Sequence, residues 1–136
     1  MQGIKTFIPT DEKVKYIQSL LGCGFDTIDF GSFVSPKAIP QMQDTAEVLA
    51  KLDLSRTKSK LLAIVANVRG AQDACEHKAI DYLGFPFSIS ENFQMRNTHK
   101  TIDQSVETLK GILELADANN KEVVTYISMG FGNPYG

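Results

Sequence analysis

The residues best suited to chemistry lie in a loop that follows a short strand-like run. The loop covers residues 31–42 and reads G-S-F-V-S-P-K-A-I-P-Q-M, and the run before it, at residues 27–30, reads T-I-D-F. Pro36 and Pro40 fix their own φ angles and turn the residues before them away from helix, so the loop is stiff. Loops of this kind on a rigid scaffold often carry function, so this loop is the first candidate site.

Other candidate side chains lie on strand-like runs. Asp29 is near the end of its run, where a carboxylate can serve a site or can be a plain polar strand end. Tyr126 and Ser128 flank Ile127 in the run at residues 123–129, and a period of two puts both on the same face. For Tyr126 that face is either the wall of a site or a place of buried packing.

The histidines, cysteines and last glycines match no cofactor motif. His77 and His99 are isolated, and neither has a partner at the spacing of metal ligands. Cys23 and Cys75 are far apart and form no C-x-x-C, which indicates two reduced, partly buried thiols. The tail G-F-G-N-P-Y-G at residues 130–136 places its third glycine one residue too late for a dinucleotide-binding turn.

Composition excludes several classes of protein. The chain has 136 residues, a net charge of -2 and 22% charged residues, values that argue against a dedicated nucleic-acid or anionic-membrane surface. No apolar run approaches the roughly 20 residues of a membrane-spanning helix. The first residues lack the pattern of a signal peptide, so a cytoplasmic protein is expected.

Apolar spacing predicts alternating helices and strands. Thr10 is expected to cap the first helix, and Thr101 with Gln104 matches a capping box for the last. The run L-L-A-I-V-A suits a parallel strand covered on both faces. The expected helices are 10–23, 41–52, 71–79 and 101–118, the expected strands are 27–30, 61–66, 82–88 and 123–129, and 89–100 is expected to be a polar loop.

This alternation predicts parallel β-α units. Two architectures remain open, an open doubly wound sheet, which the length favours, and part of a (β/α)8 barrel, which needs roughly 250 residues. The barrel is favoured because the chain starts on a helix, stops after a strand and places its polar loops after strands. We therefore expect residues 1–136 to form a single partial barrel domain.

The loop at residues 31–42 also carries a family resemblance. Its S-F-V-S-P-K followed by P-Q-M resembles the loop after the second strand of 3-hydroxy-3-methylglutaryl-CoA lyases. Met1 and Gln2 resemble the end of that family's R-D-x-x-Q motif, and the tail resembles its G-x-P-Y-G element. The resemblance covers the whole chain but only about half of such an enzyme. It implies an α/β fold in which the four strands are strands two to five of a (β/α)8 barrel.

The resemblance implies a carbon-carbon lyase of leucine degradation, which cleaves 3-hydroxy-3-methylglutaryl-CoA to acetyl-CoA and acetoacetate. It implies an acyl-CoA substrate, a homo-oligomer, and a divalent metal ion, magnesium or manganese, in the full-length parent. The family's motif Arg and Asp, its His-x-His pair, its Asn and its loop cysteine cannot be placed in this chain. We therefore expect this part alone to bind no metal ion and to be inactive.

The resemblance also implies roles for seven residues. Asp29 takes the place of a family glutamate as a catalytic carboxylate that orients the motif arginine. The implied substrate-binding residues are Gln2, Lys5, Ser32, Asn97, Tyr126 and Ser128. A loop-capping role stays open for Ser32, and the role of an ordinary solvated side chain stays open for Lys5. Two other functions also stay open, a non-catalytic half-barrel that dimerises as a binding or scaffold module, and a related acyl-CoA aldol or Claisen synthase.

Overall fold

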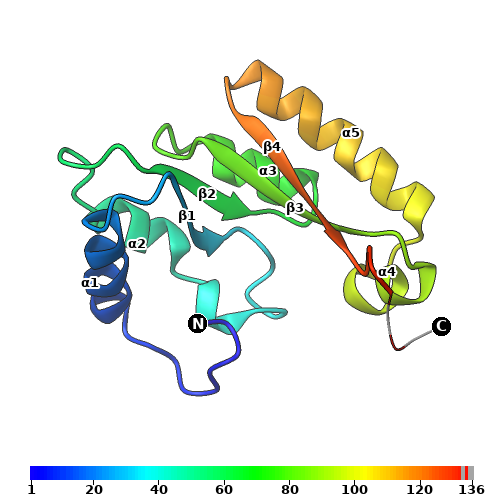
Figure 1. Cartoon of the computed structure of the whole chain (residues 1–136), viewed down its shortest axis with the longest axis horizontal. Coiled ribbons are helices and arrows are strands. Elements are labelled where there is room, and N and C mark those ends of the chain that lie inside the picture. The colour runs from blue at the N-terminus through cyan, green and yellow to red at the C-terminus, as the bar shows by residue number, and fades with distance from the viewer. Residues whose placement is uncertain (133, 135–136) are drawn as a thin grey trace.

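The computed structural model describes residues 1–132 and 134, and it shows helices alternating with strands (Figure 1). In chain order the elements are α1 (Thr10–Leu21), β1 (Thr27–Ser32), the 3-10 helix η1 (Pro40–Met42), α2 (Thr45–Lys51), β2 (Lys60–Ile64), α3 (Val68–Cys75), β3 (Tyr82–Ser88), α4 (Glu91–Thr98), α5 (Ile102–Ala118) and β4 (Glu122–Ser128).

The four strands form one parallel sheet in the order β1-β2-β3-β4. Each strand therefore pairs only with strands that are next to it in the sequence. The register shifts between Asp29 and Gly31 of β1, so a bulge lies beside the candidate loop. The predicted parallel β-α units are confirmed, and the predicted limits of β3 are those of the structure.

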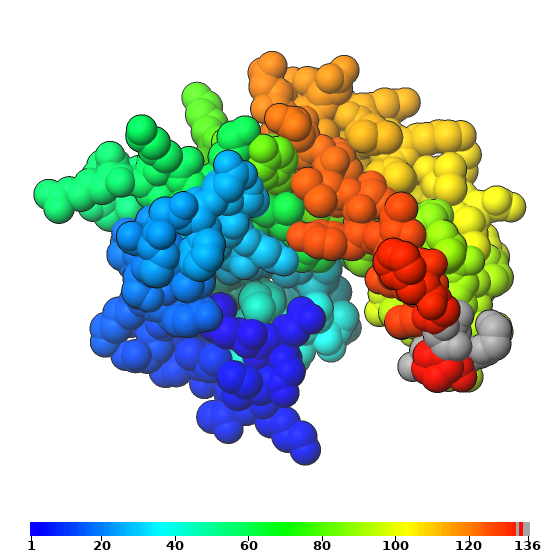
Figure 2. All heavy atoms as spheres, viewed as in Figure 1, coloured from blue at the N-terminus to red at the C-terminus, as the bar shows by residue number. Residues whose placement is uncertain are grey.

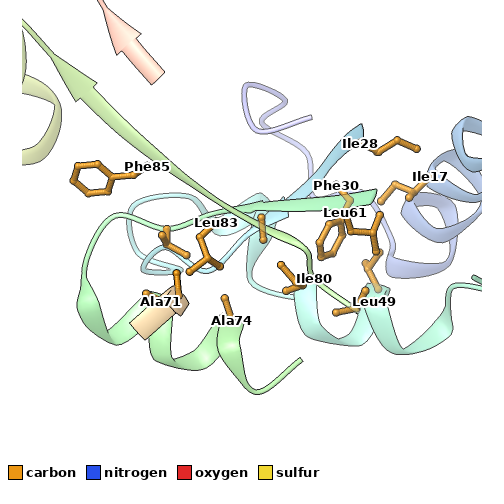
Figure 3. Close-up of a cluster of buried hydrophobic side chains, with 14 of the residues drawn as sticks. Ile17, Ile28, Phe30, Leu49, Leu61, Ala71, Ala74, Ile80, Leu83 and Phe85 are labelled. Carbon is orange, nitrogen blue, oxygen red and sulfur yellow. The ribbon is translucent and has the colours of Figure 1, made fainter. Parts of the chain in front are cut away.

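Side chains alternate between two different faces of the sheet. Leu61 and Ala63 of β2, with Leu83 and Phe85 of β3, point into a core that α1, α2, α3 and α5 cover (Figure 3). Leu62 is also buried but lies outside this core cluster, because alternation puts it on the opposite face. The prediction that β2 is covered on both faces is confirmed, because Leu61, Leu62 and Ala63 are all buried. The helices of the core cluster cover only one of these faces, and the second face is left for a site.

Helix α5 is stabilised by a local cap at its N-terminus and by packing of its buried face against the sheet. The predicted capping box is confirmed: the Thr101 hydroxyl accepts from the Gln104 amide, and the Gln104 side chain accepts from the Thr101 amide. Ile112 and Ala116 are buried in the core, whereas Leu113 is about half exposed. Ser105 is the buried polar residue of this helix.

The predicted polar loop at residues 89–100 is wrong, because it contains helix α4. The Ser90 hydroxyl accepts from the Phe93 amide and caps the helix. Gln94 is buried and donates to the hydroxyls of Thr98 and Ser105. Side-chain hydrogen bonds thus replace the apolar stripe by which a helix is usually recognised in a sequence.

The start of α1 also differs from the prediction. Pro9 occupies the N-cap position, and Thr10 is the first helical residue. The Thr10 hydroxyl donates instead to Asp44 Oδ2 at 2.8 Å, so a contact distant in sequence replaces the local cap. Cys23 lies after the helix and is exposed, not partly buried as predicted, whereas Cys75 is half-buried, and both thiols are free.

The remaining differences concern element limits. The helix expected at 41–52 is divided into η1 and α2, and the helix expected at 71–79 starts and ends earlier as α3. Strand β2 begins and ends before the expected 61–66, β1 runs two residues past 27–30, and β4 is displaced by one residue. Most of the G-x-P-Y-G tail lies outside the described residues.

Replacing Gly70 by alanine is expected to destabilise the sheet-helix packing. A Cβ atom on Gly70 of α3 would collide with the main-chain oxygen of Phe33 in the candidate loop, and the backbone cannot yield cheaply. Such overpacking costs about 1–3 kcal/mol, measured as the free energy of unfolding in urea. Gly3→Ala is the matched control, because its Cβ would meet no atom within 4 Å. Equal losses in the two variants would contradict this account.

Candidate functional site

A pocket of about 950 Å³ lies on the sheet face that the helices leave open. In Figure 2 the surface is hollowed between the dark blue N-terminal residues and the orange-red strand β4. The lining residues come from segments that are far apart in sequence: the first residues, helix α1, the ends of β1, β3 and β4, the loop after β1, the end of β2 and helix α4. The pocket is therefore built at the carboxyl ends of the parallel strands, where barrel enzymes hold their sites.

Six of the seven predicted site residues line this pocket. They are Gln2, Asp29, Ser32, Asn97, Tyr126 and Ser128. Lys5 is exposed and is not among the lining residues, so the structure does not bring it to the site. Asn97 reaches the pocket from helix α4 and not from a loop. The roles of the six residues stay predictions, but their convergence is a property of the fold.

Ser32 is fixed by hydrogen bonds within the protein. Its hydroxyl donates to the carbonyl of Ile64 at 3.3 Å and accepts from the amide of Val34 at 3.3 Å. Its own amide donates to the hydroxyl of Thr45 at 3.1 Å. This arrangement favours the loop-capping role, in which Ser32 holds the start of the candidate loop against β2.

Ser88 occupies the corresponding place at the end of β3, and the sequence reasoning missed it. Its hydroxyl donates to the carbonyl of Ser128 in β4 at 3.0 Å and accepts from the amide of Ser90 at 3.1 Å. The signal in the sequence was the serine that ends each strand, S-F-V after β1 and S-I-S after β3. Both serines tie a strand end to the next strand and so set the rim of the pocket.

Tyr126 both packs and faces the pocket. A Cβ atom on Gly84 would lie 3.0 Å from Cε2 of Tyr126, so the missing side chain makes room for the ring over β3. Tyr126 is nevertheless 40% exposed. Burial raises the pKa of the Tyr126 phenol, and the negative charge of Asp29 raises that pKa further.

Asp29, on strand β1, carries a perturbed carboxyl group. Burial raises the pKa of Asp29, because the partly desolvated charged form is disfavoured. A carboxylate with a raised pKa is a better proton acceptor near neutral pH than an ordinary aspartate. The two groups lie close enough for the charge of Asp29 to act on the Tyr126 phenol.

Replacing Asp29 by asparagine is expected to stabilise the chain slightly at neutral pH. The pKa of Asp29 is raised in the folded state, so the charged carboxylate lowers the stability of the chain. The free energy of unfolding is therefore highest below the ordinary aspartate pKa, and it falls as the pH rises through the raised pKa. The gain should stay under about 1 kcal/mol, since solvent screens this partly exposed group, and it should vanish in acid. Urea unfolding at both pH values measures it.

Equal unfolding free energies of Asp29→Asn and the wild-type chain at neutral pH would contradict the cost of the partly buried charge. Asp29→Asn should also lower the pKa of Tyr126, which ultraviolet titration of the phenol reports. An unchanged tyrosine titration would contradict the coupling between the two groups.

The part of the chain that the structure describes contains no group of three histidine, cysteine, aspartate or glutamate residues that could hold a metal ion. Asp29 is the one carboxylate among the residues that line the described pocket, whereas magnesium takes several oxygen ligands. The His77 ring lies 5.4 Å from that of Phe33, and His99 ends helix α4 with a φ of 56°. A divalent ion at this pocket would need further ligands.

No protein-family model matches the chain. A 3-hydroxy-3-isohexenylglutaryl-CoA/hydroxymethylglutaryl-CoA lyase of Pseudomonas aeruginosa is 35% identical over 135 residues, which make up 99% of this chain and 44% of that protein. The chain is a partial homologue of the hydroxymethylglutaryl-CoA lyases. The mitochondrial hydroxymethylglutaryl-CoA lyase of mouse is 30% identical over the same length and is covered to 41%.

Solved lyase structures share the fold. The hydroxymethylglutaryl-CoA lyase of Bacillus subtilis superposes with a TM-score of 0.91 and 31% identity, over 98% of this chain and 44% of that one. The lyase of Acinetobacter baumannii, solved in complex with coenzyme A and 3-methylmalate, gives a TM-score of 0.90 and 31% identity, over 98% and 43%. The chain thus spans less than half the length of the lyases it matches, and the predicted partial barrel is confirmed.

Among the residues described, no helix is both long and apolar enough to cross a bilayer. Hydroxymethylglutaryl-CoA lyases with similar sequences include proteins named as mitochondrial and as cytoplasmic. The compartment of this chain therefore does not follow from the lyases that it resembles.

Proposed function

We propose that the chain forms the acyl-CoA-binding wall of a carbon-carbon lyase that cleaves 3-hydroxy-3-methylglutaryl-CoA to acetyl-CoA and acetoacetate. One observation carries the proposal: six residues that the lyase resemblance implies for the site, from Gln2 to Ser128, line one pocket at the carboxyl ends of the strands. The lyase of A. baumannii, which shares this fold, was solved in complex with coenzyme A.

The side chains that line the pocket offer both hydrogen bonds and apolar contacts to a ligand. The amides of Gln2 and Asn97 can donate to the oxygens of the acyl group, and Ile39 and Met42 offer apolar contact to its methyl group. Asp29 can hold a cationic group or accept a proton as the tertiary hydroxyl is deprotonated. A magnesium or manganese ion in the full-length parent would stabilise substrate oxygens, but the described residues supply no ligand set for it.

The chain of 136 residues is therefore expected to bind 3-hydroxy-3-methylglutaryl-CoA without cleaving it. Calorimetry measures the affinity, and a coupled assay for acetyl-CoA measures cleavage. Asn97→Ala should weaken binding by up to about tenfold, the effect of one lost hydrogen bond. Asn92→Ala, on the same helix but lining a different pocket, is the matched control. Absent binding, or equal effects of the two variants, would overturn the proposal, and cleavage by this chain would overturn the expected inactivity.

A non-catalytic half-barrel that dimerises is the second candidate, and the sheet edges favour it. In the described part of the chain, β1 and β4 each pair with a strand on one side only. An unpaired strand edge exposes backbone donors and acceptors that a second copy can satisfy. Sedimentation shows whether the chain is a monomer or a dimer, and the same measurement tests the homo-oligomer that we propose for the lyase.

Two free cysteines support a cytoplasmic location as a further proposal.

A further inference from the structure

Gln41 is buried beneath the N-terminal segment, which comprises residues 1–9, and only 4% of the residue is exposed. Its Nε2 donates to the carbonyls of Ile4 at 2.8 Å and Thr6 at 2.7 Å, and its Oε1 accepts from the amide of Ile8 at 2.9 Å. One side chain thus pairs with three alternate residues, much as a neighbouring strand would. The segment contains no helix or strand, so its placement depends on such contacts.

The main chain of Gln41 is itself held by a buried ion pair. Lys13 of α1 donates to the carbonyl of Gln41 and pairs with Asp44 at 2.6 Å. The ammonium group of Lys13 also lies 4.0 Å from the centroid of the Phe7 ring, which belongs to the N-terminal segment. The segment is therefore fastened to α1 and to η1 at once, and Gln41 is the centre of that attachment.

Three residues of the N-terminal segment, Met1, Gln2 and Ile4, line the pocket. We propose that Gln41 is a positioning residue, which holds the N-terminal segment as one wall of the pocket and thereby supports the binding of an acyl-CoA ester. The identity of the ligand rests on the proposed function, whereas the attachment of the segment does not. Gln41 acts through Gln2 and Ile4 and is not itself among the lining residues.

Gln41→Glu in the 136-residue chain tests the proposal, with acetyl-CoA as the probe. At neutral pH the introduced carboxylate cannot donate to the carbonyls of Ile4 and Thr6, and it loses the attachment. On acidification the protonated carboxyl regains one donor. The charges nearest to it, Lys13 and Asp44, already pair with each other. We expect hydrogen exchange of the Ile8 amide to accelerate about tenfold at neutral pH and to recover in acid.

The affinity for acetyl-CoA should fall and recover over the same pH range. Gln43→Glu is the matched control, because Gln43 is exposed and the variant adds the same charge two residues away. The Leu83 amide in β3 reports whether the sheet stays folded. If Gln41→Glu unfolds the sheet, Gln41→Asn serves as the second variant. Asparagine keeps the amide but has a shorter reach, so this variant should release the N-terminal segment at every pH.

Protection of the Ile8 amide equal to that of the wild-type chain in both Gln41 variants would overturn the proposal. Release of the segment with no loss of acetyl-CoA affinity would overturn it as well, because the wall would then not matter for binding. If the wild-type chain does not bind acetyl-CoA or the larger substrate, the proposed lyase function fails, and the exchange measurements alone decide the role of Gln41.

Discussion

Lys13→Ala is expected to lower the free energy of unfolding by about 3–5 kcal/mol, the cost of removing one partner from a buried ion pair. Lys13 is only 2% exposed, and its ammonium group lies 2.6 Å from Asp44 Oδ1. Without it, the buried carboxylate keeps the Thr10 hydroxyl as a donor but has no countercharge. The carbonyl of Gln41 also loses its donor. Urea unfolding followed by circular dichroism measures the loss.

Lys15→Ala is the matched control, on the same helix and also in an ion pair. Lys15 and Glu12 are both exposed at a separation of 2.7 Å, and such pairs contribute at most about 1 kcal/mol. Comparable losses in the two variants would show that burial does not increase the contribution of the Lys13–Asp44 pair. A large loss restricted to Lys13→Ala would identify this buried pair as a main support of the packing between α1 and the start of α2.

Phe85→Ala is expected to cost about 3–5 kcal/mol of unfolding free energy, because it leaves a large cavity in the core. Phe85 is 2% exposed and lies in β3, which pairs with strands on both sides (Figure 3). The neighbouring sheet and helix are tied by hydrogen bonds and cannot collapse freely into the space. Thermal and urea unfolding measure the loss.

Phe25→Ala provides the corresponding control, since Phe25 is 54% exposed and lies between α1 and β1. It should cost well under half as much as Phe85→Ala, because surface substitutions usually change stability by about 0.5 kcal/mol or less. A small effect of Phe85→Ala would show that the helix-covered face of the sheet is loosely packed.

Strongly periodic and buried segments were predictable from the sequence, and elements held by polar contacts were not. Helix α5 and strand β3 have clear apolar patterns, and both were found where the pattern placed them. Helix α4 was missed because its buried position is a glutamine, Gln94, whose partner Ser105 lies on another helix. Propensity and periodicity describe neighbours along the chain and carry no information on such contacts.

The same limit applies to the candidate site. The family resemblance predicted the six lining residues, and strand alternation independently placed Tyr126 and Ser128 on one face. Thr10 was wrongly expected to cap α1, because its hydroxyl binds Asp44, thirty-four positions along the chain. Gln41 looked like one residue of a motif, and only the fold shows that its amide holds the N-terminal segment.

The strand order β1-β2-β3-β4 has a consequence for biosynthesis. Each strand after β1 finds a partner already made when it leaves the ribosome, so the sheet can grow by one β-α unit at a time. The N-terminal segment is the exception. It stays unattached until Gln41 and Asp44 have left the exit tunnel, and only then can the first nine residues settle against the growing sheet.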